Sequence, residues 1–449
     1  MASTKISRSI SSAGTTTKGT FSAWVKRGNL AEGFLFLSQE NGNNNFRIRF
    51  NPEVINVEVL QGGSVTATLS TVRKYLDTSA WYHICVTIDS TDGTANDRMK
   101  IYTNGVDEQT VGGYSARTNP SQNANMSINE AGTQYVGAQD SSNYFDGLMS
   151  HVHYVDGTAY PASTFGETDS TSGIWKPKTA PTVTYGTNGF FLKFENSGNM
   201  DLDSSSNGHT MTTGGTLTQT QDSPSNNYTV WNRQTRVASS GIQSGGWGHG
   251  STYVATSTSN DNYSFPSTFS FPGTGKFYME FKVGNIGTDF AAGIGEVEAM
   301  TLLFNTSGAQ KFCNNAKGWA YVKAGQKETG GSGSSYGNSF TSGDYIGLAY
   351  NNGALWFSKN GTWQNSATIS EINAGTTTNA AFTGIATAAQ YFIMFAGYND
   401  AMIEMNAGNG AFRATQDGTN NPSAGDTGAK FKYTVPTGYQ PLSTKGLNS

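Results

Sequence analysis

The sequence predicts an all-β protein made of antiparallel sheets, and three observations support this fold class. Apolar and polar residues alternate over short segments such as 46–50 and 54–59, as in strands with one buried face. Asn-Gly pairs, for example at 104–105 and 352–353, predict tight hairpin turns, because both residues tolerate a positive φ. The composition has 55 glycines, 12% aromatic residues and only 13% charged residues, which is unlike a disordered chain.

The strand signals fall into two groups along the chain of 449 residues. In chain order, the expected strands are residues 20–25, 46–50, 54–59, 81–88, 98–102, 276–283, 345–350 and 355–358, each rich in β-branched or aromatic residues. Between the groups, residues 202–227 are rich in turn formers and residues 241–250 are rich in Gly and Ser. Because a typical domain has about 150 residues, we predict two domains, 1–232 and 233–449, with the boundary near Asn232.

Charge and hydrophobicity exclude several classes of partner. The net charge is -4 and Lys and Arg do not cluster, so we expect no nucleic-acid binding. No run of roughly 18 apolar residues is present, so we expect no membrane insertion. The first residues lack the apolar segment of a secretory signal. Cys85 and Cys313 lie far apart in the chain, and we expect both to be buried, unpaired thiols.

The first half carries motifs of a lectin-like family. Residues 81–86, followed by 98–105, resemble the central hairpin of laminin-G-like, concanavalin A-type lectin domains, and 144–154 resembles their closing strand. The segments that follow are similar to a subtype common in bacteriophages: 165–168, 174–178, 185–190, 203–208 and 222–227. The resemblance covers most of residues 1–232 and implies a two-sheet sandwich.

The second half resembles a SPRY domain, another concanavalin A-like sandwich. Residues 275–281 are similar to its opening strand, and 343–349 and 355–363 to its central hairpins. The ending, 431–442, is similar to the tail of phage versions, although a long polar insert between 407 and 428 departs from the pattern. The two resemblances together imply tandem concanavalin A-like antiparallel β-sandwiches (jelly rolls) and a virion structural protein whose role is binding.

Concanavalin A-like sandwiches also include glucan hydrolases, whose nucleophile and acid carboxylates lie about 5–5.5 Å apart. These enzymes carry their acids on one strand in an E-x-D-x-x-E spacing. The nearest match here is Glu296-Val297-Glu298, which places two acids on one face without the third. We therefore expect no catalytic residues and no enzymatic activity, with a polysaccharide depolymerase as the alternative.

Two segments have partial metal-site patterns. His151 and His153 are two apart on an expected strand and point the same way, but no third ligand is placed to complete a tetrahedral site. Asp201-Leu202-Asp203 begins like a calcium loop, but serines follow where such a loop needs an acid or amide and a glycine. We expect no metal-binding residue and no cofactor, with a structural calcium ion as the alternative.

Five residues are the candidates for ligand contact, because sugars bind to aromatic rings flanked by a few polar groups. Trp247 lies in a Gly/Ser-rich segment that is not a regular core position, and packing between the two domains is favoured there over ligand contact. Trp363 follows a hairpin turn, and a structural role is favoured there over ligand contact. Asn143, Tyr144 and Tyr336 lie in polar loops, where recognition is usually located.

The resemblance and these residues together predict a non-enzymatic bacteriophage virion protein, either a tail fibre or receptor-binding protein or a capsid decoration protein. The expected location is the virion, with assembly in the host cytoplasm. The expected partners are other virion proteins and host cell-surface glycans. We expect a homo-oligomer or many copies on one particle, since weak single contacts become useful when they are multivalent. A purely structural capsid or tail protein without a glycan ligand, and a cellular adhesion lectin, are the competing hypotheses.

Overall fold

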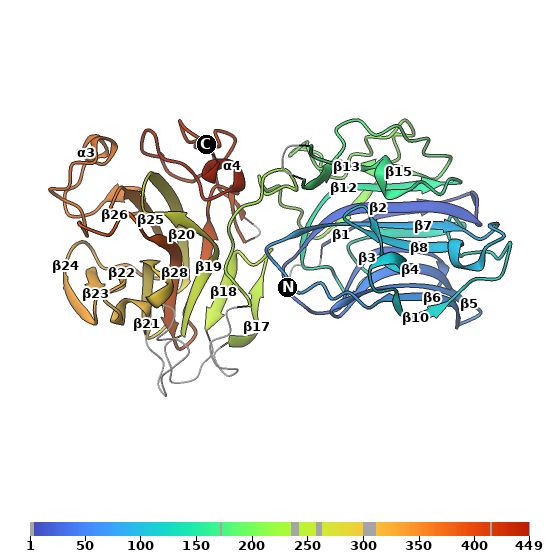
Figure 1. Cartoon of the computed structure of the whole chain (residues 1–449), viewed down its shortest axis with the longest axis horizontal. Helices are drawn as coiled ribbons and strands as arrows, with labels where there is room; N and C mark the ends of the chain where they lie inside the picture. The colour runs from blue at the N-terminus through green and yellow to red at the C-terminus, as the bar shows by residue number, and fades with distance from the viewer. Residues whose placement is uncertain are drawn as a thin grey trace. The chain divides into compact units, whose positions relative to one another are not determined.

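The computed structural model describes residues 4–170, 173–234, 242–256, 263–299, 311–413 and 415–448. The chain forms two compact units, one of Met1–Gln219 with Ser223–Ser225 and one of Thr220–Asp222 with Asn226–Ser449 (Figure 1). Both are built from antiparallel sheets, so the predicted all-β class is confirmed. In the described parts of the chain, no helix has the length and apolar character needed to cross a membrane.

The first unit contains two large sheets. The eight-stranded sheet has the order β10 (Tyr114–Thr118), β6 (Ser64–Thr71), β5 (Val54–Gln61), β4 (Asn44–Asn51), β3 (Gly33–Asn41), β11 (Gly132–Val136), β1 (Lys5–Ile10) and β16 (Thr212–Gly214). The six-stranded sheet has the order β15 (Phe190–Leu192), β12 (Gly147–Asp156), β2 (Lys18–Arg27), β7 (Trp81–Asp89), β8 (Met99–Thr103) and β9 (Val106–Asp107). A small hairpin and short helical turns complete it: β13 (Gly166–Thr168), β14 (Trp175–Pro177), η1 (Ala95–Asp97), α1 (Glu108–Val111) and η2 (Ala162–Thr164).

The alternation predicted from the sequence matches the core of the first unit. In β4, Phe46, Ile48 and Phe50 are fully buried, whereas Arg47 and Arg49 between them are only partly buried. The buried set packs with the inward residues of the facing sheet in one cluster. Burial of each such side chain contributes about 1.5–3 kcal/mol relative to leaving it in water.

The outer face of the six-stranded sheet is also covered. Residues 157–170 and 173–190 bring Phe165 and Tyr185 against the sheet, next to Cys85 and Val155. For this reason β2 is buried at every residue after its first, where the sequence predicted a strand with one solvated face. Because these residues cover the outer face of β2, the outward side chains are buried as well as the inward ones, although β2 remains a regular strand.

The second unit also contains two large sheets. The seven-stranded sheet has the order β17 (Ile242–Gly248), β18 (Tyr253–Thr256), β29 (Met402–Asn406), β20 (Lys276–Asn285), β25 (Tyr345–Asn351), β26 (Ala354–Lys359) and β27 (Thr362–Trp363). The six-stranded sheet has the order β19 (Tyr263–Pro272), β28 (Gln390–Tyr398), β21 (Asp289–Gly295), β22 (Gly318–Val322), β23 (Gln326–Thr329) and β24 (Ser332–Ser335). The remaining elements are β30 (Ala411–Phe412), β31 (Thr415–Gln416), η3 (Phe312–Asn314), α3 (Ile369–Ala374) and α4 (Thr444–Leu447).

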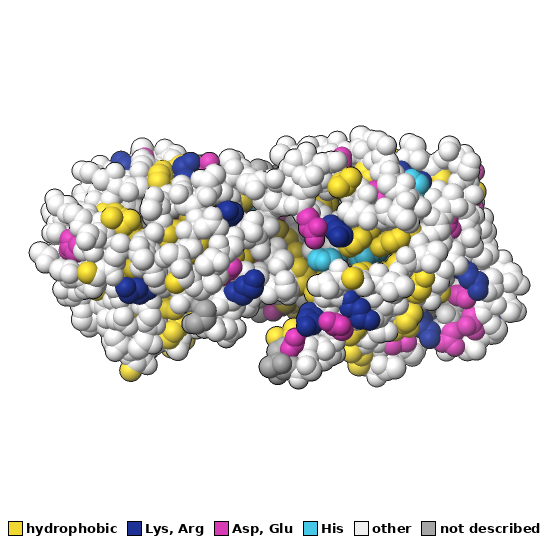
Figure 2. Space-filling model, turned by 90° about the horizontal axis from the view of Figure 1, so that it is seen from above, with side chains coloured by type: hydrophobic (Ala, Val, Ile, Leu, Met, Phe, Trp, Pro, Cys, Tyr) yellow, Lys and Arg dark blue, Asp and Glu magenta, His cyan; other side chains and the backbone are white. Residues whose placement is uncertain are grey.

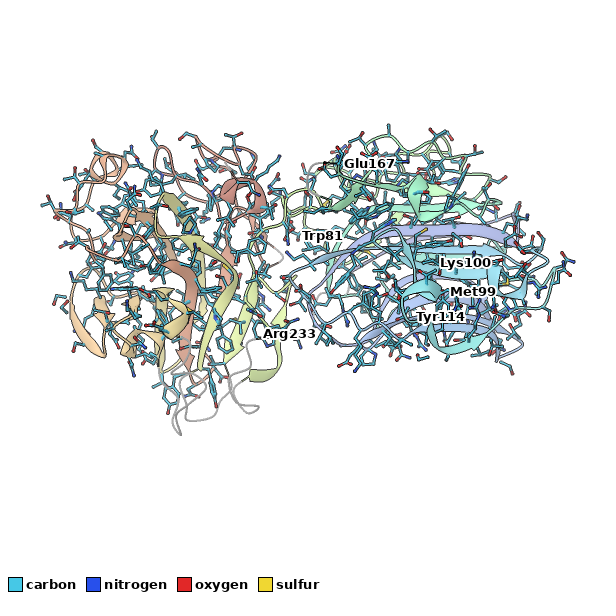
Figure 3. The ribbon with its side chains drawn as sticks, in the orientation of Figure 1. Trp81, Met99, Lys100, Tyr114, Glu167 and Arg233 are labelled. Carbon is cyan, nitrogen blue, oxygen red and sulfur yellow. The ribbon has the colours of Figure 1, made fainter. Side chains whose placement is uncertain are left out.

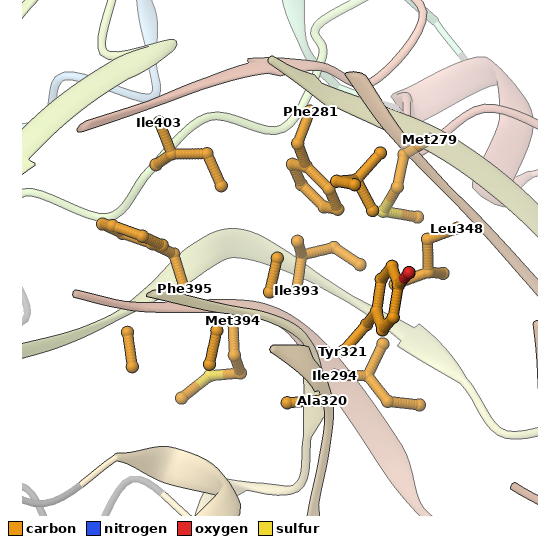
Figure 4. Packing of buried hydrophobic residues seen from close by; sticks show 14 of the residues in the cluster. Met279, Phe281, Ile294, Ala320, Tyr321, Leu348, Ile393, Met394, Phe395 and Ile403 are labelled. Carbon is orange, nitrogen blue, oxygen red and sulfur yellow. The ribbon is translucent and has the colours of Figure 1, made fainter. Parts of the chain in front are cut away.

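The two sheets of the second unit enclose a dense apolar core. Phe281 of β20 and Ile403 of β29 meet Ile393 and Phe395 of β28 (Figure 4). All four side chains are fully buried. Interdigitation at this density makes the core intolerant of changes in side-chain volume.

The boundary between the units falls before the predicted Asn232. Residues 226–232, which we assigned to the first domain, pack into the second unit. Trp231 is fully buried there, with its ring 6.2 Å from that of Phe281 and 6.1 Å from that of Phe395. The apolar side chains of this segment therefore place it with the second core.

Both cysteines are free and buried, as predicted. Cys85 lies under the segment that covers the six-stranded sheet, and Cys313 lies in the core of the second unit. Burial raises the pKa of both thiols, which keeps them protonated and unreactive.

A buried carboxylate attaches the C-terminal tail to the outer face of the seven-stranded sheet. Glu280 accepts hydrogen bonds from the backbone N–H of Lys432 (2.8 Å) and of Tyr433 (2.8 Å). It also accepts from the hydroxyl of Tyr278 (2.9 Å) and from the amide of Asn406 (3.4 Å). The C-terminal tail is thus held by hydrogen bonds to the Glu280 carboxylate, and no local sequence pattern indicates this contact.

Glu280→Gln should lower the free energy of unfolding of the second unit by about 1–3 kcal/mol, because one backbone N–H would then face an amide N–H. Burial raises the pKa of Glu280 to about 7 from its ordinary value of 4.5. The native state therefore binds the proton more tightly than the unfolded state, and this group's contribution of about 3 kcal/mol is lost as the pH rises from 4.5 to 7. Urea unfolding at pH 5 and pH 7.5 should show a larger difference between wild type and variant at pH 5. A difference that grew toward pH 7.5 would contradict this assignment.

Candidate functional site

Two loops of the first unit lie side by side at one end of the sandwich, and we call them the rim: residues 28–32 between β2 and β3, and residues 137–146 between β11 and β12. The backbone N–H of Gly28 donates to the carbonyl of Asp146 (2.7 Å). The side-chain amide of Asn29 donates to the Asp146 carboxylate (2.9 Å). These contacts hold the two loops together.

A buried arginine fixes the position of the rim. Arg27, at the end of β2, is 1% exposed, and its guanidinium lies 4.2 Å from the centre of the Phe50 ring. It donates hydrogen bonds to three carbonyls, those of Tyr75 (2.8 Å), Ala31 (3.0 Å) and Pro52 (2.7 Å). The Arg27 guanidinium thus links the rim to two other loops at this end of the unit, the one that contains Pro52 and the one that contains Tyr75.

The rim continues into a row of charged side chains on the outer face of the eight-stranded sheet. Arg49 donates to Glu32 of the rim (2.7 Å), to Asn56 (3.0 Å) and to Glu58 (3.1 Å). Arg47 donates to Glu58 as well (2.6 Å). The side chains of Arg47, Arg49 and Glu58 are only 16%, 15% and 13% exposed, so they are held flat on the sheet.

Two of the predicted ligand residues lie on this rim. Asn143 is exposed, and its amide donates to the Gln139 side chain (2.8 Å). Its φ of 47° places it in the left-handed region, which asparagine tolerates better than most residues. Tyr144 is half-buried next to it, in the same loop as Asp146, which accepts from Asn29.

Two other predicted ligand residues are buried in the second unit. Trp247 is 7% exposed and packs edge-on against Phe265 at 5.7 Å, with the guanidinium of Arg233 5.7 Å from its ring (Figure 3 labels Arg233). Tyr336 is 6% exposed, and its hydroxyl accepts from the backbone N–H of Phe357 (3.0 Å). The ligand role predicted for Trp247 and the loop-surface position predicted for Tyr336 are corrected, because both rings complete the core of the second unit.

The fifth candidate, Trp363, is half-buried. Its ring lies 6.3 Å from that of Tyr278 in an edge-to-face arrangement and packs on the cluster under the C-terminal tail. Trp363 therefore has the structural role that the sequence analysis considered for it. Of the five candidates, only Asn143 and Tyr144 share one site.

The carboxylate of the suspected calcium loop already has partners. Asp203 is 4% exposed and accepts from the backbone N–H groups of Phe191 (2.9 Å), Ser205 (2.9 Å) and His209 (2.8 Å). Its oxygens therefore stabilise a turn. Within the described residues, no group of three or more His, Cys, Asp or Glu side chains is arranged to hold a metal ion.

The paired histidines of β12 are separated by a bulge. The register shifts between Ser150 and His153, and His151 has a φ of 48°. His153 is 2% exposed, stacks on Phe191 at 3.8 Å, and shares a hydrogen bond of 2.8 Å with the hydroxyl of Tyr185. His153 is part of a packed aromatic layer.

Sequence reasoning missed Arg27 and the charged row. Charged side chains are sparse over the face shown in Figure 2, as the composition requires. Arg47 and Arg49 alternate with buried residues in β4, which is the signal that could have placed them on the outer face. No pattern in the sequence around Arg27 indicates that its side chain is buried.

Comparison with protein families gives one match. Residues 3–164 match the model of a family described as the concanavalin A-like lectin/glucanases superfamily, of laminin-G type. This segment includes the whole rim and the charged row. Comparison with curated proteins found no match.

Comparison with solved structures includes two matches of low similarity. The SPRY domain of human HERC1 is 13% identical, with a TM-score of 0.26, and the match covers 39% of this chain and 96% of that chain. A native heptameric SAP-like pentraxin from Limulus polyphemus is 16% identical, with a TM-score of 0.28, and the match covers 42% of this chain and 88% of that chain. Similarities this distant carry no functional argument.

Proposed function

We propose, from the match of residues 3–164 to the concanavalin A-like lectin/glucanases superfamily, that the protein binds carbohydrate through the rim of its first unit. The observation that carries this proposal is that the rim is preformed. Arg27 and the Asn29–Asp146 contact hold its backbone, while Asn143 and Tyr144 lie at the surface. A preorganised site loses less conformational entropy on binding.

The residue types at the rim suit a saccharide. Asn143 and Asp146 offer amide and carboxylate groups for hydroxyls, and Tyr144 offers a partly exposed aromatic ring with a hydroxyl. Glu32 and Arg49, at the start of the charged row, add an acceptor and a donor beside them. Polar groups around one aromatic side chain are the usual composition of a shallow sugar site.

We propose binding without catalysis. Among the described residues, the carboxyl groups with a raised pKa are Glu280 and Glu404, both in the second unit. A glycosidase needs such a carboxyl group as its acid. Glu280 is fully buried and engaged by four donors, and Glu404 is only 4% exposed, so neither carboxyl group is open to a substrate.

We further propose that the protein is displayed in many copies on a bacteriophage virion, bound to other virion proteins and to host-surface glycans. This rests on the resemblance of several segments to phage proteins: 165–168, 174–178, 185–190, 203–208, 222–227 and 431–442. A single shallow rim suits a millimolar-to-micromolar affinity, on the order of 4–8 kcal/mol. Many copies on one particle would raise the effective concentration of each site for its glycan.

The test is a glycan array and a host-cell pull-down with the multimerised full chain. Asn143→Gly combined with Tyr144→Ala should lower binding at least tenfold. The fold should persist, because glycine tolerates the left-handed φ of 47° at position 143 and Tyr144 is only half-buried. Gln122→Ala, in an exposed loop that precedes β11, is the matched control and should bind like wild type. No retention of wild type above the double variant would leave only a structural role. Release of reducing ends from host polysaccharide would instead identify an enzyme.

A further inference from the structure

An open pocket of the first unit lies between two segments that follow β15. It is lined by residues 193–196, Asn199, Leu202 and Ser204. Leu192 and Asp203 form a β-bridge between the two segments, and the Asp203 carboxylate accepts from the backbone N–H of Phe191 (2.9 Å). The two walls of the pocket are therefore held together by the fold itself.

The pocket is accessible from solvent, and it is small. Five of its seven lining residues are exposed, among them Glu195 and Asn199. Its volume is about 80 Å³. Since a water molecule needs about 10–15 Å³ by this measure, the pocket has room for roughly five to eight atoms of that size. It can therefore take one functional group of a ligand but not a whole sugar ring.

The backbone at the pocket has an unfavourable conformation that other contacts maintain. Phe194 has a φ of 61°, in the left-handed region that bulky residues rarely adopt. Its ring packs on the core of the unit, and the side-chain amide of Gln219 donates to the carbonyls of Phe194 (2.8 Å) and Glu195 (2.9 Å). Such strain persists only where the surrounding structure enforces it, and it is concentrated at functional sites. The shape of the pocket is thus fixed before a ligand binds.

The lining combines a donor, an acceptor and an apolar surface. The Lys193 ammonium lies 3.9 Å from the Glu195 carboxylate, which is too long for a hydrogen bond, and the Glu195 side chain is 72% exposed. Both groups are therefore open to a ligand. The amides of Asn196 and Asn199 line the same pocket, and Leu202, which is 46% exposed, supplies an apolar wall.

These groups match an acetamido group better than an ion or a hydroxyl group. The N–H of an acetamido group can donate to Glu195, and its carbonyl can accept from Lys193 or from an asparagine amide. Its methyl group can cover Leu202, which a hydroxyl group would leave in water. An anion would face the Glu195 carboxylate and a cation would face the Lys193 ammonium, so an ion of either sign gains one charge contact and meets one repulsion.

We propose that this pocket takes the acetamido group of an N-acetylated saccharide. The inference rests on the proposed carbohydrate binding of the first unit and names the class of sugar, but no residue of the rim lines the pocket. It follows that sugars with an N-acetyl group bind more tightly than matched sugars without one.

The test is saturation-transfer NMR of the full chain with three sugars that differ only at C2: N-acetylglucosamine, glucosamine and glucose. The acetyl methyl group should receive the strongest saturation from the protein, and the other two sugars should receive at least fivefold less. Leu202→Ser should lower the methyl signal at least fivefold, because it removes the apolar wall. Glu195→Ala should lower it as well, because the amide N–H loses its acceptor. Both side chains are exposed, so both variants should fold.

The controls separate the pocket from the rim. Val65→Ser is the matched control, because Val65 is 47% exposed in the same unit and does not line the pocket. It should keep the methyl signal, and so should the rim variant that combines Asn143→Gly with Tyr144→Ala. A signal from glucosamine or glucose as strong as that of N-acetylglucosamine would overturn the proposal, as would a methyl signal unaffected by Leu202→Ser and Glu195→Ala. Loss in the rim variant alone would place the acetamido group at the rim, which overturns the pocket and supports the rim.

Discussion

Lowering the pH from 7 to 5 should reduce the free energy of unfolding of the first unit by about 4 kcal/mol, through two buried histidines. His83 is fully buried, and burial lowers its pKa to about 3 from 6.5. Burial also lowers the pKa of His153 well below 6.5. The unfolded chain binds these protons and the native state does not. The stabilisation is therefore complete above pH 6.5 and is lost as the pH falls, by about 2 kcal/mol per histidine at pH 5.

The hydrogen bonds of His83 explain why it stays neutral. The indole N–H of Trp175 donates to its Nδ1 (3.0 Å), so that nitrogen must be unprotonated. The Nε2 atom then carries the hydrogen and donates to the Ser22 hydroxyl (2.8 Å). The ring also stacks on Trp24 at 4.9 Å. A proton added at Nδ1 would face the indole N–H directly.

The measurement is urea unfolding at pH 7, 6 and 5, followed by pulse proteolysis in which peptides of β2 and β7 report the first unit. His83→Gln should remove about half of the loss between pH 7 and 5. His209→Gln is the control, because His209 is partly exposed and should change the pH dependence much less. Equal slopes for wild type and both variants would refute the role of the buried histidines.

Arg27→Met should destabilise the first unit by about 3–5 kcal/mol, which is typical when one partner of a buried charged contact is removed. Methionine fills similar volume beside Phe50, so the effect comes from the lost polar contacts of the guanidinium, among them its hydrogen bonds to three carbonyls. Arg27→Lys should give an intermediate loss, since one ammonium cannot match the geometry of the guanidinium fork. Urea unfolding of the first unit measures both variants.

The same substitution should disorder the rim. Hydrogen exchange in residues 28–32 and 137–146 should become faster in Arg27→Met, and glycan binding should weaken with it. Arg117→Met is the control, because Arg117 lies at the sheet edge with several exposed contacts and should change stability by less than about 1 kcal/mol. Unchanged exchange in the rim would show that Arg27 does not organise it.

Local patterns predicted the strands well, because side-chain alternation and turn chemistry act over a few residues. The Asn-Gly pairs at 104–105, 352–353 and 360–361 all have positive φ at both residues, as a type I′ hairpin turn requires. The alternation at 46–50 gave the correct inward face of β4. These features need no knowledge of the rest of the chain.

The candidate site was predicted only in part. Asn143 and Tyr144 were recognised because they lie in a polar loop, and such loops stay at the surface. Trp247 and Tyr336 follow the same reasoning and are nevertheless buried, since their rings close on strands distant in sequence. A Gly- and Ser-rich sequence shows that a segment is irregular, but it does not show what will cover it.

By itself the sequence determined the all-β class, most strands and hairpins, and the two buried thiols, since each follows from composition or from spacing within one element. Tertiary structure alone decided which polar and aromatic groups became available. Arg27 donates to carbonyls in three loops and Glu280 holds the C-terminal tail, both through contacts between segments that are distant in sequence. The physical reason is that burial depends on a second covering layer, whose path is set by long-range packing.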